Sequence, residues 1–137
     1  MQIRRQFIVS VLAGLLLAAC IENATDGRIL TWHREGGLAG FCDDVSVYTN
    51  GQVRATSCRG GQPRDLGASR LTDDQLRQVL AWRDKLKGFE INQADPATAD
   101  KMTVRLVFAG AGAVAATEAD RQAIQDFAVK LFADSSK

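Results

Sequence analysis

Residues 44–58 read DVSVYTNGQVRATSC, and this stretch decides the fold. Apolar and polar side chains alternate on both sides of a central Asn-Gly pair, which predicts a β-hairpin. A two-residue turn would pair Val47 with Arg54 and mix the two faces. A three-residue loop, with Gly51 in the left-handed conformation of a bulge, instead pairs Val47 with Val53. Since only this register keeps the apolar side chains on one face, we expect the three-residue loop.

The same register places Cys42 directly opposite Cys58. The only other cysteine, Cys20, lies in a separate N-terminal motif described below, which leaves an even pair. In an oxidising compartment such a pair is expected to form a disulfide. Closing a loop of this size stabilises a fold by about 3 kcal/mol in the chain-entropy model.

A glycine-rich stretch, residues 34–42, precedes the hairpin and reads REGGLAGFC. Glycine adopts positive φ and lets another backbone approach closely, at an entropic cost that some structural need should offset. Either the stretch makes a tight turn, with its two large apolar side chains in the core, or it presents them to a partner. We predict a partner-binding loop formed by Gly36, Gly37, Leu38, Ala39, Gly40 and Phe41.

The N-terminus has the layout of a secretory signal peptide, residues 1–19. Two arginines precede a 13-residue apolar run, which is short for a membrane span and matches a signal h-region. The alternative is an uncleaved N-terminal anchor. The run ends LAAC at Cys20, which resembles the lipobox of bacterial lipoproteins. That resemblance implies that Cys20 becomes the N-terminus and carries acyl chains such as palmitate.

A lipidated chain would be held on the bacterial envelope by its acyl chains. Ile21 follows the cysteine where an aspartate would suggest retention in the inner membrane, so we expect the outer membrane, facing the periplasm. Residues 20–27 then form the lipidated cysteine and a short tether, and residues 28–134 form a single domain. Without the signal peptide 15 basic residues remain against 16 acidic ones, which argues against nucleic-acid binding.

The remaining pattern predicts an α+β domain in the order β-β-β-α-β-β-α. We expect an antiparallel sheet of four to five strands with two helices packed on one face. Strands are expected at residues 28–34, 44–48, 53–58, 102–108 and 114–116, and residues 59–70 are expected as a loop. Thr72 and Gln75 predict a capping box, Gly88 a helix stop, and Thr117 the cap of the last helix. Residues 89–101 are expected as a connection with a one-turn start at Asp95-Pro96.

Catalytic chemistry is poorly represented in the mature chain. Its one histidine, His33, lacks the partners for a hydrolytic triad or a zinc site, and we expect it to be a strand residue at the rim. Two carboxylates at a suitable distance can hydrolyse glycosides, and the sequence does not define that distance. Asp43 and Asp44 are typical of a solvated strand start, and Asp95 of a cap. We therefore expect no enzyme, no metal and no cofactor. The carboxylates considered are Glu35, Asp43, Asp44, Asp95 and Asp100.

The order of features resembles emfourin-like proteins, which are small proteinaceous inhibitors of thermolysin-like metallopeptidases. The resemblance runs from about residue 31 to residue 131, and its motif is the GGLAG stretch at residues 36–40, with Asp100 before a strand as support. It implies inhibition of a metallopeptidase. The lipid anchor, the cysteine pair and the long loop at residues 59–70 depart from the pattern.

Two functions follow as hypotheses. In the first, the chain is an envelope lipoprotein that inhibits a secreted or periplasmic metallopeptidase through the glycine-rich loop. In the second, it is a non-catalytic, lipid-anchored interaction or structural module that uses a sheet face or an edge strand. Exposure of Leu38 and Phe41 would favour the first hypothesis, and their burial the second.

Overall fold

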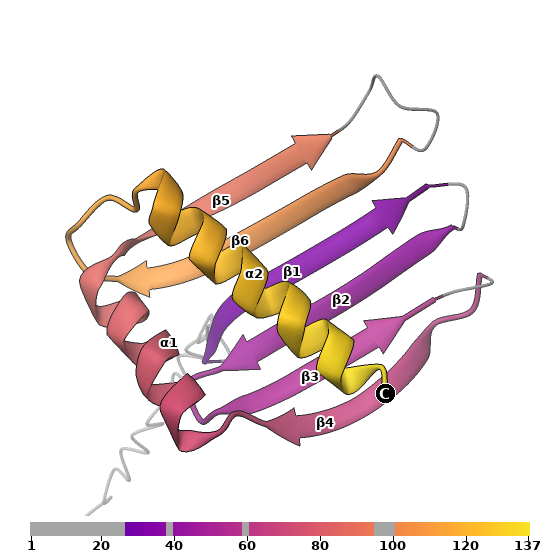
Figure 1. Ribbon diagram of the computed structural model, residues 1–137, viewed down its shortest axis with the longest axis horizontal. Coiled ribbons are helices and arrows are strands. Elements are labelled where there is room, and N and C mark those ends of the chain that lie inside the picture. Colours follow the sequence, from indigo (N-terminus) through magenta and orange to yellow (C-terminus); the bar gives the residue numbers. More distant parts are fainter. Residues whose placement is uncertain (1–26, 38–39, 59–60, 95–100) are drawn as a thin grey trace, which may run out of the picture.

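The computed structural model describes residues 27–37, 40–58, 61–94 and 101–137. Within these residues the chain forms an antiparallel six-stranded sheet and two helices (Figure 1). The elements are β1 (Arg28–Gly36), β2 (Phe41–Tyr48), β3 (Gln52–Ser57), β4 (Arg64–Arg70), α1 (Asp73–Lys85), β5 (Lys87–Ala94), β6 (Thr103–Ala111) and α2 (Glu118–Ser135).

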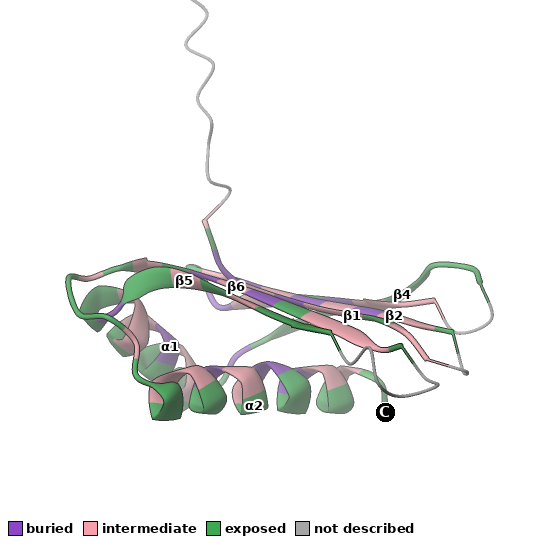
Figure 2. Cartoon of the chain, turned by 90° about the horizontal axis from the view of Figure 1, so that it is seen from above, coloured by how far each residue is buried: buried purple, intermediate pink, exposed green. Residues whose placement is uncertain are grey.

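The strands lie in the order β4-β3-β2-β1-β6-β5, so the first strand is in the middle of the sheet. Both helices cover the same face, and none of the described elements covers the other, which we call the open face (Figure 2). The expected α+β class, with an antiparallel sheet and two helices on one face, is confirmed. The expected four to five strands were too few, because the sheet has six.

The β2–β3 hairpin has the expected register. Val47 pairs with Val53 and Val45 with Ala55, while Gly51 has a φ of 79° and donates its N–H to Tyr48. All four paired apolar side chains are buried under the helices. Burial of the apolar face therefore selects the three-residue loop over the two-residue turn.

Side-chain caps define both helix starts, as the sequence indicates. Thr72 and Gln75 form the capping box of α1, and Thr117 and Asp120 form that of α2. In each, the threonine oxygen accepts from an otherwise unpaired N–H of the first turn, which fixes where the helix begins.

The core lies between the helices and the covered face of the sheet. Trp32 of β1 packs against Phe132 of α2 with ring centroids 5.7 Å apart, and the rings of Trp82 and Phe127 join the two helices edge to face at 5.6 Å. The buried apolar residues are Ile29, Leu30, Trp32, Val45, Val47, Val53, Ala55, Leu71, Val79, Leu86, Leu106, Phe108, Ile124, Ala128 and Leu131.

The expected loop at residues 59–70 contains an edge strand, β4. Its side chains are mostly exposed, and only Leu66 packs partly against the core. Because few side chains of this edge strand are buried beneath the helices, its sequence does not need to alternate between apolar and polar residues. Such a sequence resembles that of a loop. Gly67, at a φ of 95°, lies where the pairing with β3 shifts register.

The expected connection after α1 is also wrong, because residues 87–94 form the second edge strand, β5. The helix ends with buried Leu86 as its C-cap in an extended conformation, and Gly88, expected as the helix stop, lies in β5. The expected strand at residues 114–116 is reduced to a single bridge between Val114 and Leu86. Strand β6 therefore forms its hairpin with β5, and not with the expected strand at residues 114–116.

Several expectations concern residues outside the described part of the chain. The signal peptide, the lipidated Cys20 and the tether up to residue 26 are among them, as are Leu38, Ala39, Asp95 and Asp100. Within the described part, neither helix has the length and apolar character needed to cross a membrane.

Candidate functional site

The glycine-rich stretch lies at one end of the sheet. Strands β1, β3 and β5 all finish there, at Gly36, Ser57 and Ala94, and we call this the distal end (Figure 1). The opposite end, where β1 begins at Arg28, is the proximal end. The predicted loop joins β1 to β2, and Gly36 pairs with Phe41 at its base.

The described glycines of this loop all require positive φ, with 95° at Gly36, 76° at Gly37 and 61° at Gly40. The Gly40 N–H donates to the Gly37 carbonyl over 3.0 Å. At Gly36 a Cβ atom would lie 2.5 Å from the backbone oxygen of Lys101, so the loop base also packs against the start of β6. Both backbone conformation and space therefore demand glycine here.

Phe41 lies against Arg34 rather than standing free. The Arg34 Cζ atom is 4.5 Å from the centre of the Phe41 ring, 5.5 Å from Trp32 and 5.8 Å from Phe132. A guanidinium group within about 6 Å of aromatic ring centres is attracted by their electron-rich faces. Phe41 is half-buried in this arrangement, and Leu38 lies outside the described residues.

Asp43 is buried beneath the same arginine, with 1% of its surface exposed. Its Oδ2 accepts from Nε of Arg34 at 3.2 Å and from Nη2 at closer range, and its Oδ1 accepts from Ser57 Oγ at 2.7 Å. The expectation that Asp43 is a solvated residue is wrong. A buried carboxylate needs this degree of pairing, because an uncompensated charge in the interior costs several kcal/mol.

The cysteine pair lies directly beside this cluster. Cys42 in β2 and Cys58, which directly follows β3, are within disulfide distance. Their Cα atoms are 5.2 Å apart, and the Cys58 N–H donates to the Cys42 carbonyl over 3.1 Å. Asp43 pairs with Ser57 at the next position of the ladder. A disulfide between these two cysteines would fix β2, the strand that leads out of the glycine-rich loop.

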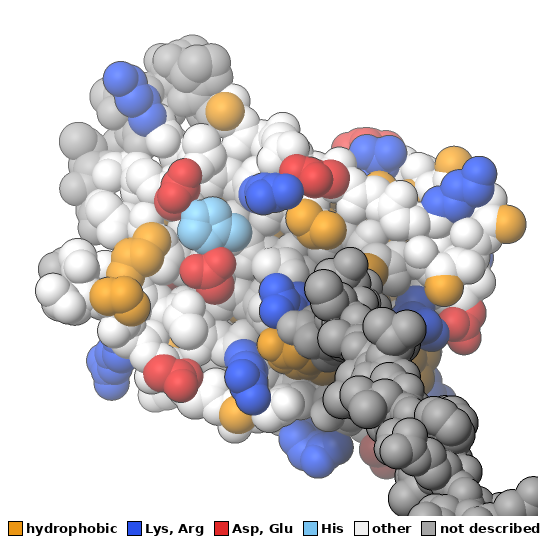
Figure 3. All heavy atoms as spheres, turned by 180° about the vertical axis from the view of Figure 1, so that it is seen from behind, with side chains coloured by type: hydrophobic (Ala, Val, Ile, Leu, Met, Phe, Trp, Pro, Cys, Tyr) orange, Lys and Arg blue, Asp and Glu red, His pale blue; other side chains and the backbone are white. Residues whose placement is uncertain are grey.

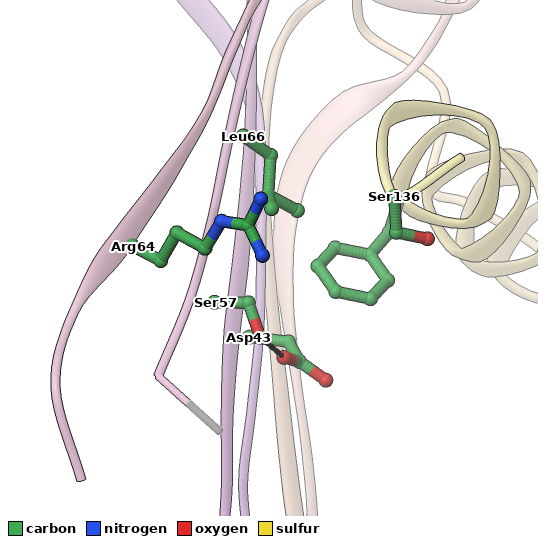
Figure 4. A pocket seen from close by; sticks show the side chains of 6 residues that line it. Asp43, Ser57, Arg64, Leu66 and Ser136 are labelled. Atoms are coloured by element: carbon green, nitrogen blue, oxygen red, sulfur yellow. Dashed lines mark hydrogen bonds between the residues drawn. The ribbon is translucent and has the colours of Figure 1, made fainter. Parts of the chain in front are cut away.

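A cavity of about 320 Å³ opens next to Asp43, between β4 and the end of α2. Figure 4 shows Arg64 extending from β4 toward Asp43 and Ser57, with Ser136 on the opposite side. The lining residues are Asp43, Ser57, Arg64, Leu66, Phe132 and Ser136. Sequence reasoning missed this cavity because two of its residues come from the unrecognised strand β4.

The open face of the sheet presents His33 between two carboxylates. Nδ1 lies 2.7 Å from Oδ1 of Asp44, and Nε2 lies 3.2 Å from Oε2 of Glu35. Figure 3 shows the histidine, in pale blue, with acidic side chains beside it. Partial burial lowers the pKa of His33, but its hydrogen bonds and charge interactions with both carboxylates outweigh this and raise the pKa above its usual 6.5.

A second, shallower hollow of about 510 Å³ begins at His33 and extends along the distal half of β5 and β6. Arg105 at its rim is paired with Glu90 at 2.8 Å. The lining residues are His33, Glu35, Asn92, Gln93, Ala94, Thr103, Val104 and Arg105. In the described ranges no three His, Cys, Asp or Glu side chains come together as a metal site.

Four of the six predicted loop residues, Gly36, Gly37, Gly40 and Phe41, lie in the described part of the chain at the distal end of the sheet, where Phe41 directly precedes Cys42. The structure adds Arg34, Asp43 and Ser57 as a buried polar support, which the sequence analysis missed. The available signal was the alternation in β2, where Asp43 shares a face with Val45.

Comparisons of the chain with protein-family models, with curated proteins and with solved structures gave no match.

Proposed function

We propose that this chain is a lipid-anchored lipoprotein of the bacterial envelope that inhibits a secreted or periplasmic metallopeptidase. The inhibitory element is the glycine-rich loop of residues 36–41, and the anchor is an acylated Cys20. The lipobox-like sequence supports the anchor. The resemblance of the GGLAG stretch to emfourin-like proteins supports the inhibitory role.

The observation that carries the inhibitory role is the fixation of both sides of the loop. On the β1 side, Gly36 packs on the Lys101 backbone, and on the β2 side Phe41 lies against Arg34 next to the disulfide. An inhibitor loop binds tightly when the entropy of ordering it is lost during folding and not during binding. Backbone without side chains at three positions also lets a peptidase cleft approach closely.

The second candidate is a non-catalytic interaction or structural module on the same anchor. The observation that favours it is the open face of the sheet, which no described element covers (Figure 2). The half-buried position of Phe41 also fits this candidate, since that side chain is held by Arg34 and is not free to enter a pocket.

Titration of a thermolysin-like peptidase with the mature chain tests the inhibitory role. We expect inhibition at micromolar or lower concentration, and Leu38→Asp should weaken it by at least about tenfold because a charge would enter an apolar contact. A matched control is Val114→Asp. Val114 is 50% exposed and follows β6 at the proximal end, so the same charge change there should leave inhibition unchanged.

No inhibition by the parent chain at micromolar concentration would reject the inhibitory role and favour the interaction module. If Leu38→Asp and Val114→Asp changed inhibition equally, the inhibitory surface would have to lie outside the glycine-rich loop. The anchor is tested separately by metabolic labelling with palmitate. The parent chain should incorporate label and Cys20→Ala should not.

A further inference from the structure

Three arginines gather at the proximal end of the open sheet face. The guanidinium carbons of Arg28 and Arg54 each lie 5.8 Å from the ring centre of Tyr48. Arg70, on the neighbouring strand β4, donates from Nη2 to the carbonyl of Asn50 over 3.0 Å. We call Arg28, Tyr48, Arg54 and Arg70 the proximal arginine patch.

Two members of this patch carry a charge that no carboxylate in the described part of the chain neutralises. Neither Arg54 nor Arg70 forms an ion pair there, and both are exposed. The acidic side chains Asp44, Glu35 and Glu90 of the same face instead pair with His33 and Arg105. The open face is therefore positive at its proximal end and acidic around His33.

The described chain begins beside this patch. The Gly27 carbonyl accepts the N–H of Thr49, in the turn that follows Tyr48, over 2.7 Å. Six residues separate Gly27 from Cys20 in the sequence. Even a fully extended chain of this length spans at most about 25 Å, so a lipid on Cys20 would keep the patch close to the membrane surface.

We propose that the proximal arginine patch binds the headgroups of anionic phospholipids in the membrane that holds the anchor. This inference rests on the proposed lipid anchor. The contact directs the distal end, with the glycine-rich loop, away from the bilayer. Each arginine near an anionic surface contributes about a fivefold gain in binding, and the phenol of Tyr48 suits the polar interface. Because the lipid anchor already holds the chain at the membrane, the contact is effectively intramolecular, and a low affinity of the patch for headgroups is sufficient.

The test uses the full-length lipoprotein reconstituted into vesicles, with a fluorophore on Gln52→Cys. Gln52 pairs with Arg70 and lies two residues from Arg54 on the same strand. In vesicles with about a third phosphatidylglycerol, we expect the label to be at least threefold less accessible to an aqueous quencher than in phosphatidylcholine. Salt at about 0.5 M should remove the difference by screening. A label on Asn92→Cys, on the open face of β5, should show no such protection.

The double variant Arg54→Glu/Arg70→Glu should abolish the protection of Gln52→Cys. Its matched control is Arg77→Glu/Arg83→Glu, which makes the same charge change on α1, on the other side of the sheet, and should preserve the protection. Near-ultraviolet circular dichroism checks that both variants keep the native fold.

Flotation with pure phosphatidylcholine vesicles measures membrane attachment through the acyl anchor alone, because these vesicles carry no net charge. It therefore tests the anchor separately from lipid binding by the proximal arginine patch. A chain that floats while its Gln52 label stays equally exposed in anionic and neutral vesicles would overturn the patch and leave the anchor intact. A chain that does not float would overturn the anchor, and the inference with it.

Discussion

At the scale of single residues, the ion pair between Arg34 and Asp43 joins the core to the glycine-rich loop. The two partners differ in burial, since the Asp43 side chain is 2% exposed and that of Arg34 is 25% exposed. Removing the arginine leaves a charge that water cannot reach, whereas removing the aspartate leaves a guanidinium that water can partly solvate.

We therefore expect Arg34→Met to lower the free energy of unfolding by about 3–5 kcal/mol, in the range for breaking a buried pair. Asp43→Asn should cost less, about 1–3 kcal/mol. Urea denaturation measures both values. The control is Arg105→Met, which removes the exposed pair with Glu90 and should lower the free energy of unfolding much less than Arg34→Met. Equal losses for Arg34→Met and Asp43→Asn would show that Asp43 does not depend on this partner.

Two glycines of the loop provide a second prediction. In Gly36→Ala the new methyl group would meet the Lys101 backbone at 2.5 Å, whereas in Gly40→Ala it would meet nothing within 4 Å. Both positions have positive φ. Gly40→Ala should cost about 1 kcal/mol for the left-handed conformation, and Gly36→Ala about 1–3 kcal/mol more because the backbone must shift. Thermal or urea unfolding compares the two, and a smaller loss for Gly36→Ala would contradict the packing at the loop base.

His33 makes stability depend on pH. Because folding raises its pKa, the stabilisation is fully present below the unfolded-state pKa of about 6.5 and is lost as pH rises through the folded-state pKa. The loss should be at most about 1 kcal/mol, since the histidine and both carboxylates are partly exposed. Unfolding curves between pH 5 and 8, about the titration range of histidine, should show this slope. It should vanish in His33→Gln.

At the scale of secondary structure elements, we expect a disulfide between Cys42 and Cys58 to stabilise the β2–β3 hairpin. It would close a loop with a sequence separation of 16 residues, which in the chain-entropy model stabilises the fold by about 3 kcal/mol. Cys42→Ala/Cys58→Ala should lower the free energy of unfolding by this amount. Reduction of the parent chain should lower it similarly, and two reactive thiols in the unreduced mature chain would show that the bond does not form.

The elements that could be predicted are those whose ends are defined by nearby residues, such as a turn glycine or a helix cap. The β2–β3 register follows from the alternation around Gly51, and the helix starts follow from the caps Thr72 and Thr117, because each of these depends on neighbours only a few residues away. The edge strands β4 and β5 were missed. Each pairs on one side only and has mostly exposed side chains. Strand β4 lacks apolar alternation, and in β5 the alternation is limited to Phe89 and Ile91, which pack against the core.

At the scale of the whole molecule, the support beneath the loop depends on contacts that the sequence does not define. Arg34, Asp43 and Ser57 lie side by side only because β1, β2 and β3 are neighbours in register, and Phe132 reaches them from the last helix. The local sequence pattern was enough to predict that the loop lies at the end of a strand. Predicting the cavity beside it would have required the sheet order, which places β4 at the edge.

The central position of β1 has a mechanical consequence. A pull between the proximal and distal ends of this strand would run along its length, while its hydrogen bonds to β2 and β6 lie across that direction. Such a load shears the bonds of two ladders together and does not open them one after another. The strand that joins the proposed anchor to the proposed loop is thus the one best placed to bear tension.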